Sequence, residues 1–115
     1  MPFTAAGTAS VTRNGSQQFQ GLFSDMWGVS ITGANPANVA AGAEDTQTYT
    51  VPGVALGDLV LFDSLSVSET VDADINVYVS AANTITVRIT NLNASTGLDF
   101  AAGTVIKILI GRPAW

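Results

Sequence analysis

The sequence predicts an all-β fold, an antiparallel β-sandwich with an extended N-terminal arm, for which a jelly-roll arrangement is one option. Three observations lead to this prediction. The runs INVYV and TITVRIT alternate apolar and polar residues with the period of a β-strand. Short apolar runs are separated by turn signals, without a helical period. The 115 residues fit one domain, and 13 Thr and 9 Ser residues suit strands with hydroxyl-covered faces.

The first segment, residues 1–25, is polar and rich in small residues. Its apolar residues are isolated, which predicts an extended arm with room for one short strand. A β-sandwich body is expected over residues 26–115. Isolated apolar side chains on an arm suit docking onto a neighbouring surface better than building a core of their own. These apolar residues are Phe3, Val11, Phe19, Leu22 and Phe23.

Three strands are predicted in the first half of the body. The run 26–32 is closed by a Gly-Ala-Asn-Pro turn. The Thr-rich run 46–51 alternates and stops at a Pro-Gly pair. The short apolar run 59–62 follows a Gly-Asp pair. Turn residues therefore bound each of these segments, as expected for a sandwich of short strands.

The second half of the body contains the clearest strand pattern. Residues 75–79 and 84–90 alternate on either side of a short polar break, which predicts an antiparallel hairpin. Residues 105–110 are apolar on both faces apart from Lys107. This run predicts a central strand of a sheet that is covered on both sides.

Composition excludes several classes of function. The net charge is −5, and the few basic residues are scattered, so we expect no binding to nucleic acid and no docking on anionic membranes. The chain has no Cys and no His, which removes disulfides, thiolate chemistry and the commonest general base. No signal peptide or membrane span is recognised, so synthesis in a cytoplasm is expected. The four basic residues are Arg13, Arg88, Lys107 and Arg112.

A resemblance covers residues 50–91 and leaves the N-terminal arm unmatched. The strings TVPGVALGDLVLFDS and VYVSAANTITVRITN resemble a pattern in small β-domains of tailed-bacteriophage structural proteins. In that pattern a T-V-x-G turn precedes a G-D-x-V strand, and a V-S-A-x-N-T hairpin follows. The resemblance implies a structural role in a virion. The matching positions are Thr50, Val51, Gly53, Gly57, Asp58, Val60, Val79, Ser80, Ala81, Asn83, Thr84, Thr86 and Val87.

Acidic residues are the only candidates for metal binding or catalysis. Asp72 and Asp74 offer oxygens to a divalent cation, but a solvated acidic loop is the favoured interpretation, and no metal or cofactor is predicted. Asp58 is interpreted as a turn-capping residue. Composition leaves open a pair of catalytic carboxylates, as in glycosidases. The small size and the missing histidine nevertheless predict a protein that is not an enzyme.

Aromatic residues are the candidates for binding. Trp27 is interpreted as a core residue of the first body strand. For Trp115, the last residue, a contact with another subunit and packing on its own body are equally favoured. The predicted partner-binding residues are Phe3, Val11, Phe19, Phe23 and Trp115.

The leading hypothesis is a capsid decoration (cement) protein on the virion surface. It would be a homotrimer that binds the major capsid protein and stabilises the capsid lattice through many modest contacts. The alternative is a tail fibre, spike or other tail-associated component with a receptor- or glycan-binding β-domain, in which Tyr49 and Tyr78 are candidates. A cytoplasmic enzyme or carbohydrate-binding module is disfavoured by the missing histidine and the low charge.

Overall fold

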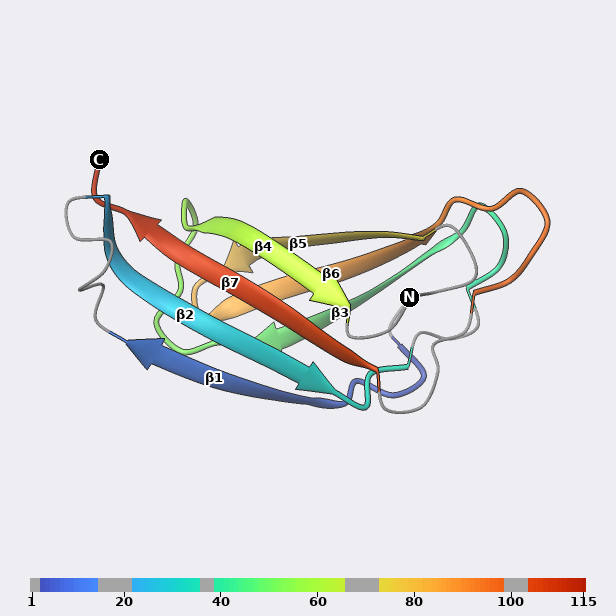
Figure 1. Ribbon diagram of the computed structural model, residues 1–115, viewed down its shortest axis with the longest axis horizontal. Coiled ribbons are helices and arrows are strands. Elements are labelled where there is room, and N and C mark those ends of the chain that lie inside the picture. Colours follow the sequence, from blue (N-terminus) through green and yellow to red (C-terminus); the bar gives the residue numbers. More distant parts are fainter. Residues whose placement is uncertain (1–2, 15–21, 36–38, 66–72, 99–103) are drawn as a thin grey trace.

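The computed structural model describes residues 3–14, 22–35, 39–65, 73–98 and 104–115, and these residues form seven β-strands and no helix (Figure 1). The all-β prediction is therefore confirmed. The strands are β1 (Thr8–Asn14), β2 (Phe23–Thr32), β3 (Glu44–Thr50), β4 (Leu59–Leu65), β5 (Ala73–Ala81), β6 (Thr84–Asn91) and β7 (Val105–Pro113).

The strands form two sheets that lie one over the other. One sheet has the order β1-β2-β7-β4 and the other the order β3-β6-β5, and every pair is antiparallel. In Figure 1 the four-stranded sheet lies in front of the three-stranded one. The last strand, β7, is inserted between β2 and β4, as in a Greek key. The sandwich is confirmed, with four and three strands in the described residues rather than the two four-stranded sheets of a jelly roll.

The core lies between the sheets and follows the alternation of the strands. The predicted hairpin is confirmed as β5 and β6, with Asn83 in the left-handed region at φ 59°. Asn76 and Tyr78 point out while Val77 and Val79 are buried. The facing positions in the middle of β2 and β7 are also aliphatic, apart from Trp27. The innermost side chains are Trp27, Val29, Ile31, Ile85, Val87, Ile89, Ile106 and Ile110.

Strand β7 is central, as predicted, but the predicted cover on both sides is wrong for the described residues. Ile106, Ile108 and Ile110 face the other sheet and are buried. Lys107 is exposed and Leu109 is only half-buried on the opposite face. The apolar run therefore marks one buried face and one face that lies at the surface of the sandwich.

The N-terminal segment belongs to the body as far as the structure describes it. Residues 8–14 form β1, which pairs with β2 along its whole length. Phe3 is buried in the core, and the Tyr49 hydroxyl donates a hydrogen bond of 2.7 Å to the Ala6 carbonyl. The predicted boundary after residue 25 falls inside β2. The arm interpretation underestimated β1, because Val11 is the only large aliphatic residue in this strand and its pairing with β2 has no local sequence signal.

Candidate functional site

The outward-facing side of the four-stranded sheet is the candidate functional site, and we call it the outer face. Antiparallel pairing places residues of β1, β2, β7 and β4 in rows that cross the sheet. Each row draws on four separate parts of the chain, so only the fold brings these residues together. Two rows lie at the centre of the outer face. The first consists of Thr12, Gly28, Leu109 and Phe62, and the second, next to it, consists of Ser10, Ser30, Lys107 and Ser64.

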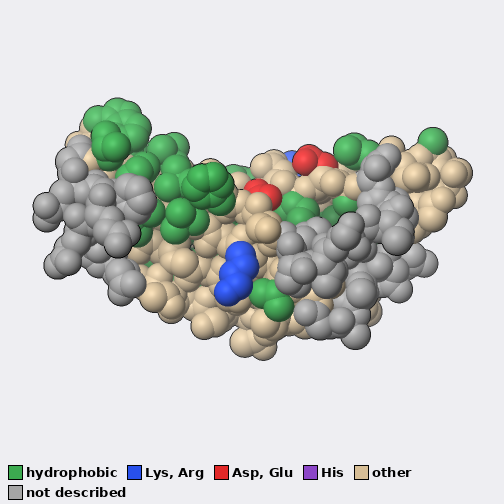
Figure 2. Space-filling view, viewed as in Figure 1, with side chains coloured by type: hydrophobic (Ala, Val, Ile, Leu, Met, Phe, Trp, Pro, Cys, Tyr) green, Lys and Arg blue, Asp and Glu red, His purple; other side chains and the backbone are tan. Residues whose placement is uncertain are grey.

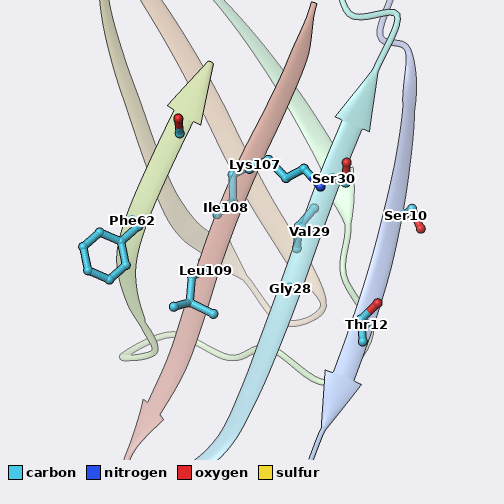
Figure 3. A pocket seen from close by; sticks show the side chains of 10 residues that line it. Ser10, Thr12, Gly28, Val29, Ser30, Phe62, Lys107, Ile108 and Leu109 are labelled. Carbon is cyan, nitrogen blue, oxygen red and sulfur yellow. The ribbon is translucent and has the colours of Figure 1, made fainter. Parts of the chain in front are cut away.

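A shallow groove of about 300 Å³ runs over these two rows (Figure 3). Gly28 forms its floor because it has no side chain. A Cβ atom placed on Gly28 would have no neighbour closer than 3.8 Å, the carbonyl oxygen of Thr12. In Figure 3 the Lys107 side chain extends from β7 towards Ser30 on β2. The groove therefore combines a depression at Gly28 with a positive charge beside it.

Apolar side chains extend the groove towards the end of β7, where the chain terminates. The Phe23 and Trp115 rings contact each other, with centroids 6.0 Å apart. Phe62 and Trp115 are exposed by 70% and 77%, unusually high for such large apolar side chains. In Figure 2 hydrophobic side chains gather at this end of the molecule. We call Phe23, Met26, Leu59, Phe62, Leu109 and Trp115 the apolar cluster.

Close packing at Gly111 holds part of the apolar cluster in place. A Cβ atom on Gly111 would lie 2.8 Å from the Phe23 ring and 3.2 Å from the Met26 sulfur. Both side chains therefore lie directly on the backbone of β7. The Ala114 N–H also donates a hydrogen bond of 2.8 Å to the Leu22 carbonyl. The C-terminal residues are thus tied to the start of β2, next to Phe23.

The end of the sandwich core is closed by two arginines that enclose Trp27. The guanidinium carbons of Arg13 and Arg112 lie 5.0 and 5.1 Å from the Trp27 ring centroid. The indole N–H donates a hydrogen bond of 3.0 Å to the Pro52 carbonyl. Trp27 is fully buried, which confirms its interpretation as a core residue. This cluster stabilises the fold and leaves no aromatic surface free for a ligand.

Asp58 holds the loop between β3 and β4 onto this cluster. Its carboxylate accepts two hydrogen bonds of 2.9 Å from Arg112 and a third of 2.9 Å from the Ala55 N–H. The third bond confirms the predicted turn-capping role. The Asp58 side chain is 4% exposed, and its hydrogen bonds raise the pKa of Arg112. The ion pair between Arg112 and Asp58 was not predicted. The sequence did contain a signal for it, because Arg112 continues the inward alternation of β7 and a charge that points inwards needs a partner.

The second arginine of the Trp27 cluster also has an acidic partner. Arg13 forms an ion pair with Asp25, and its Nε donates a hydrogen bond of 2.8 Å to the same carboxylate. The Met26 N–H donates to the other Asp25 oxygen. Hydrogen bonding to Arg13 lowers the pKa of Asp25. Both arginines at Trp27 are therefore neutralised within the chain.

The predicted partner-binding residues separate into three groups. Phe3 is wrong as a partner-binding residue, because it is buried in the chain's own core. Val11 packs partly against the same core from β1. Phe23 and Trp115 lie together in the apolar cluster. Phe19 lies outside the described residues. Trp115 contacts Phe23 on its own body and remains largely exposed, and its contact with another subunit stays a prediction.

Acidic residues form no metal site in the part of the chain that the structure describes. Asp74 is exposed, and Asp72 lies outside the described residues. Burial, together with the charge of Asp74, raises the pKa of Asp63. No helix among the described residues is long and apolar enough to span a membrane.

The two tyrosines considered for glycan binding differ in position. Tyr49 is buried, and burial raises its pKa to about 12. It is therefore not accessible to a glycan. Tyr78 is 38% exposed on the outward side of the three-stranded sheet, and the Arg88 guanidinium carbon lies 5.7 Å from its ring centroid. Only Tyr78 remains a candidate.

Comparison with known proteins assigns no family: no family model, no curated protein and no solved structure matches the chain. Several residues that carry the phage resemblance have structural roles. The Gly53 N–H donates a hydrogen bond of 2.7 Å to the Asn83 side chain, which joins the two matching strings. Gly53 and Gly57 have φ values of 96° and 97°. Asp58 caps the turn of residues 55–58. Folding requirements explain the residue types at these positions. The matching residues therefore indicate a shared turn and strand structure, and they do not by themselves indicate a shared function.

Proposed function

We propose that this chain is a structural virion protein, a capsid decoration protein that works by binding and assembly rather than by catalysis. Its partner is the major capsid protein, it acts as a homotrimer, and it lies on the capsid surface. The outer face is the part that contacts the shell. The observation that carries this proposal is the exposure of Phe62 and Trp115 on a sheet face where Lys107 is the one charged residue among the described outward-facing positions.

The size of the outer face suits a decoration protein. Four strands spaced about 4.8 Å apart, taken over the seven residues of the shortest strands β1 and β4, cover a footprint of roughly 440 Å². A stable pairwise interface buries about 800 Å² on each partner. One such contact would therefore be weak. Repetition over the subunits of a trimer and over a regular lattice raises the total affinity without new contacts.

Two measurements test the proposal. Mass spectrometry of purified virions should give a copy number close to that of the major capsid protein, and a value far below it would contradict decoration. The variants Phe62→Ser and Trp115→Ser should reduce the copy number on the capsid while the purified protein keeps its fold. Leu92→Ser is the matched control, because Leu92 is 63% exposed but follows β6 of the other sheet.

The second candidate function, a tail fibre or spike domain, is favoured by one observation. Tyr78 and Arg88 lie on the outward side of the three-stranded sheet, where the Arg88 guanidinium N–H donates a hydrogen bond of 3.4 Å to the Tyr78 hydroxyl. An exposed aromatic ring beside a cation suits a sugar with an acidic group. A glycan array read with the native chain and Tyr78→Ala tests this candidate. Binding that needs Tyr78, with a low copy number per virion, would replace decoration as the function.

A further inference from the structure

Lys107 differs from the other basic residues of the chain. Arg13, Arg88 and Arg112 each have a carboxylate within 4.0 Å. Lys107 is the only lysine in the sequence, and the described residues offer it no carboxylate at that distance. It is exposed and lies at the groove of the outer face. No carboxylate of the described residues therefore neutralises its charge.

The surroundings of Lys107 are polar but uncharged. Its neighbours across the sheet are Ser30 on β2 and Ser64 on β4. Among the described residues, no other outward-facing position of the four strands carries a charge. The chain as a whole is acidic, with a net charge of −5. A cation on a neutral face of an acidic protein is complementary to a carboxylate.

The Gly28 depression lies one strand repeat away from Ser30, towards which the Lys107 side chain extends (Figure 3). Gly28 is paired with Leu109, two residues beyond Lys107 along β7. Residues two apart in a strand point to the same side and lie about 6.6 Å apart. An extended peptide that runs along these strands has its own alternate side chains at the same spacing. An acidic residue over the end of the Lys107 side chain, at Ser30, therefore brings an apolar residue two positions away over Gly28, beside Leu109.

We propose that the outer face binds an extended segment of its protein partner, in which an acidic and an apolar residue are separated by one position. The carboxylate pairs with Lys107, and the apolar side chain fills the depression at Gly28. This inference rests on the proposed function, since it names the chemistry of the partner at the same face. A second copy of the chain is a poor occupant, because its outer face would bring another Lys107 and no carboxylate from its described outward-facing residues.

Short capped peptides provide the direct test. The probe alternates Thr with one Glu and one Leu at the stated spacing, and two further peptides carry Gln or Lys in place of Glu. Titration followed by two-dimensional amide NMR should shift signals of β2 and β7 at the central rows. The Glu peptide should bind about fivefold more tightly than the Gln peptide, as expected for an ion pair on a partly exposed surface. The Lys peptide should bind most weakly.

Substitutions at the groove separate the charge from the depression. Lys107→Gln should abolish the difference between the Glu and Gln peptides, and Lys107→Glu should make the Lys peptide the preferred one. Gly28→Ala should weaken all three peptides about threefold, because about one methylene of burial is lost. Thr48→Val, which changes an exposed residue of the three-stranded sheet, is the matched control and should change none of these affinities.

Three results would overturn the inference. These are equal affinities for the three peptides, signal shifts confined to the three-stranded sheet, and concentration-dependent shifts at the central rows without peptide, which would identify a second copy as the occupant. Copy numbers of the variants in purified virions distinguish failure of this inference from failure of the proposed function. If Lys107→Gln leaves the copy number unchanged while Phe62→Ser lowers it, decoration stands and the acidic segment does not. A copy number far below that of the capsid protein, with the Glu preference intact, would refute decoration alone.

Discussion

Replacement of Gly7 by alanine tests whether the start of β1 is seated on the body of the sandwich. Gly7 has φ +74°, and a Cβ atom there would lie 2.2 Å from the Thr32 carbonyl oxygen and 2.5 Å from the Ala34 nitrogen. Both are backbone atoms, so no side chain can rotate to make room. Gly42 has the same φ of +74°, but a Cβ atom there would meet nothing within 4 Å. The two glycines therefore share their backbone strain and differ in their packing.

The expected magnitudes follow from this difference. An alanine at positive φ is disfavoured by about 1 kcal/mol, partly offset by the lower entropy of the unfolded chain. Gly42→Ala should therefore lower the free energy of unfolding by about 0.5–1 kcal/mol. Gly7→Ala adds an overpacking term of about 1–3 kcal/mol, because the backbone of the segment around residue 33 must move. Its total loss should reach about 2–4 kcal/mol.

Urea unfolding at equilibrium measures both variants, with the fluorescence of the buried Trp27 as the signal. The midpoint should fall clearly for Gly7→Ala and slightly for Gly42→Ala, with similar slopes. Equal losses for the two variants would refute the reasoning. The residues before β1 would then not lie against Thr32 and Ala34, and the extended-arm interpretation of this segment would be restored.

Three further substitutions have defined outcomes. Asp58→Asn should lower the free energy of unfolding by about 2–4 kcal/mol in urea unfolding, because it leaves the part-buried Arg112 without its charged partner; a loss below about 0.5 kcal/mol would contradict this. Tyr49→Phe removes a phenol whose pKa is about 12 in the folded chain and about 10 when unfolded. Since the folded pKa is raised, the phenol contributes about 2–3 kcal/mol below pH 10 that is lost as the pH rises from about 10 to 12. Urea unfolding over this pH range should therefore show a smaller decline for Tyr49→Phe than for the native chain, and equal declines would contradict the burial effect. Gly28→Ala should raise the free energy of unfolding by up to about 0.5 kcal/mol, because no atom lies closer than 3.8 Å to the added carbon; a clear loss would mean that the groove floor is packed.

The strands of the body were predictable because their alternation is local. The hairpin of β5 and β6 satisfies a period of two in eight or nine consecutive residues, with a polar break that only a short turn explains. Strand β1 lacks that signal, since Val11 is its only large aliphatic residue. Strand β1 is stabilised by its pairing with β2. The sequence of an edge strand does not show which strand it pairs with, so this pairing could not be predicted from residues 8–14 alone.

The candidate site was predictable only in part, for a related reason. Phe23 and Trp115 were predicted as partner-binding residues, although nothing in the sequence relates position 23 to position 115. The rows of the outer face depend on the register of three strand pairs, so the neighbours of Lys107 could not be named in advance. The sequence did contain one clear signal. Lys107 interrupts an apolar run, and a charge at that position must point to a surface.

The distribution of charge separates the parts of the chain that maintain the fold from the part available to a partner. Arginines occupy positions where a cation is paired within the chain, at Trp27 and beside Tyr78, and their rigid forks suit carboxylates and aromatic rings. The single lysine lies where the described part of the chain offers no carboxylate partner. Lysine is a flexible point charge that adapts to a partner's carboxylate without a fixed geometry. Lys107→Arg should accordingly retain the preference for the Glu peptide, whereas Arg112→Lys should destabilise the fold, because a lysine cannot form both hydrogen bonds to Asp58 and stack on Trp27.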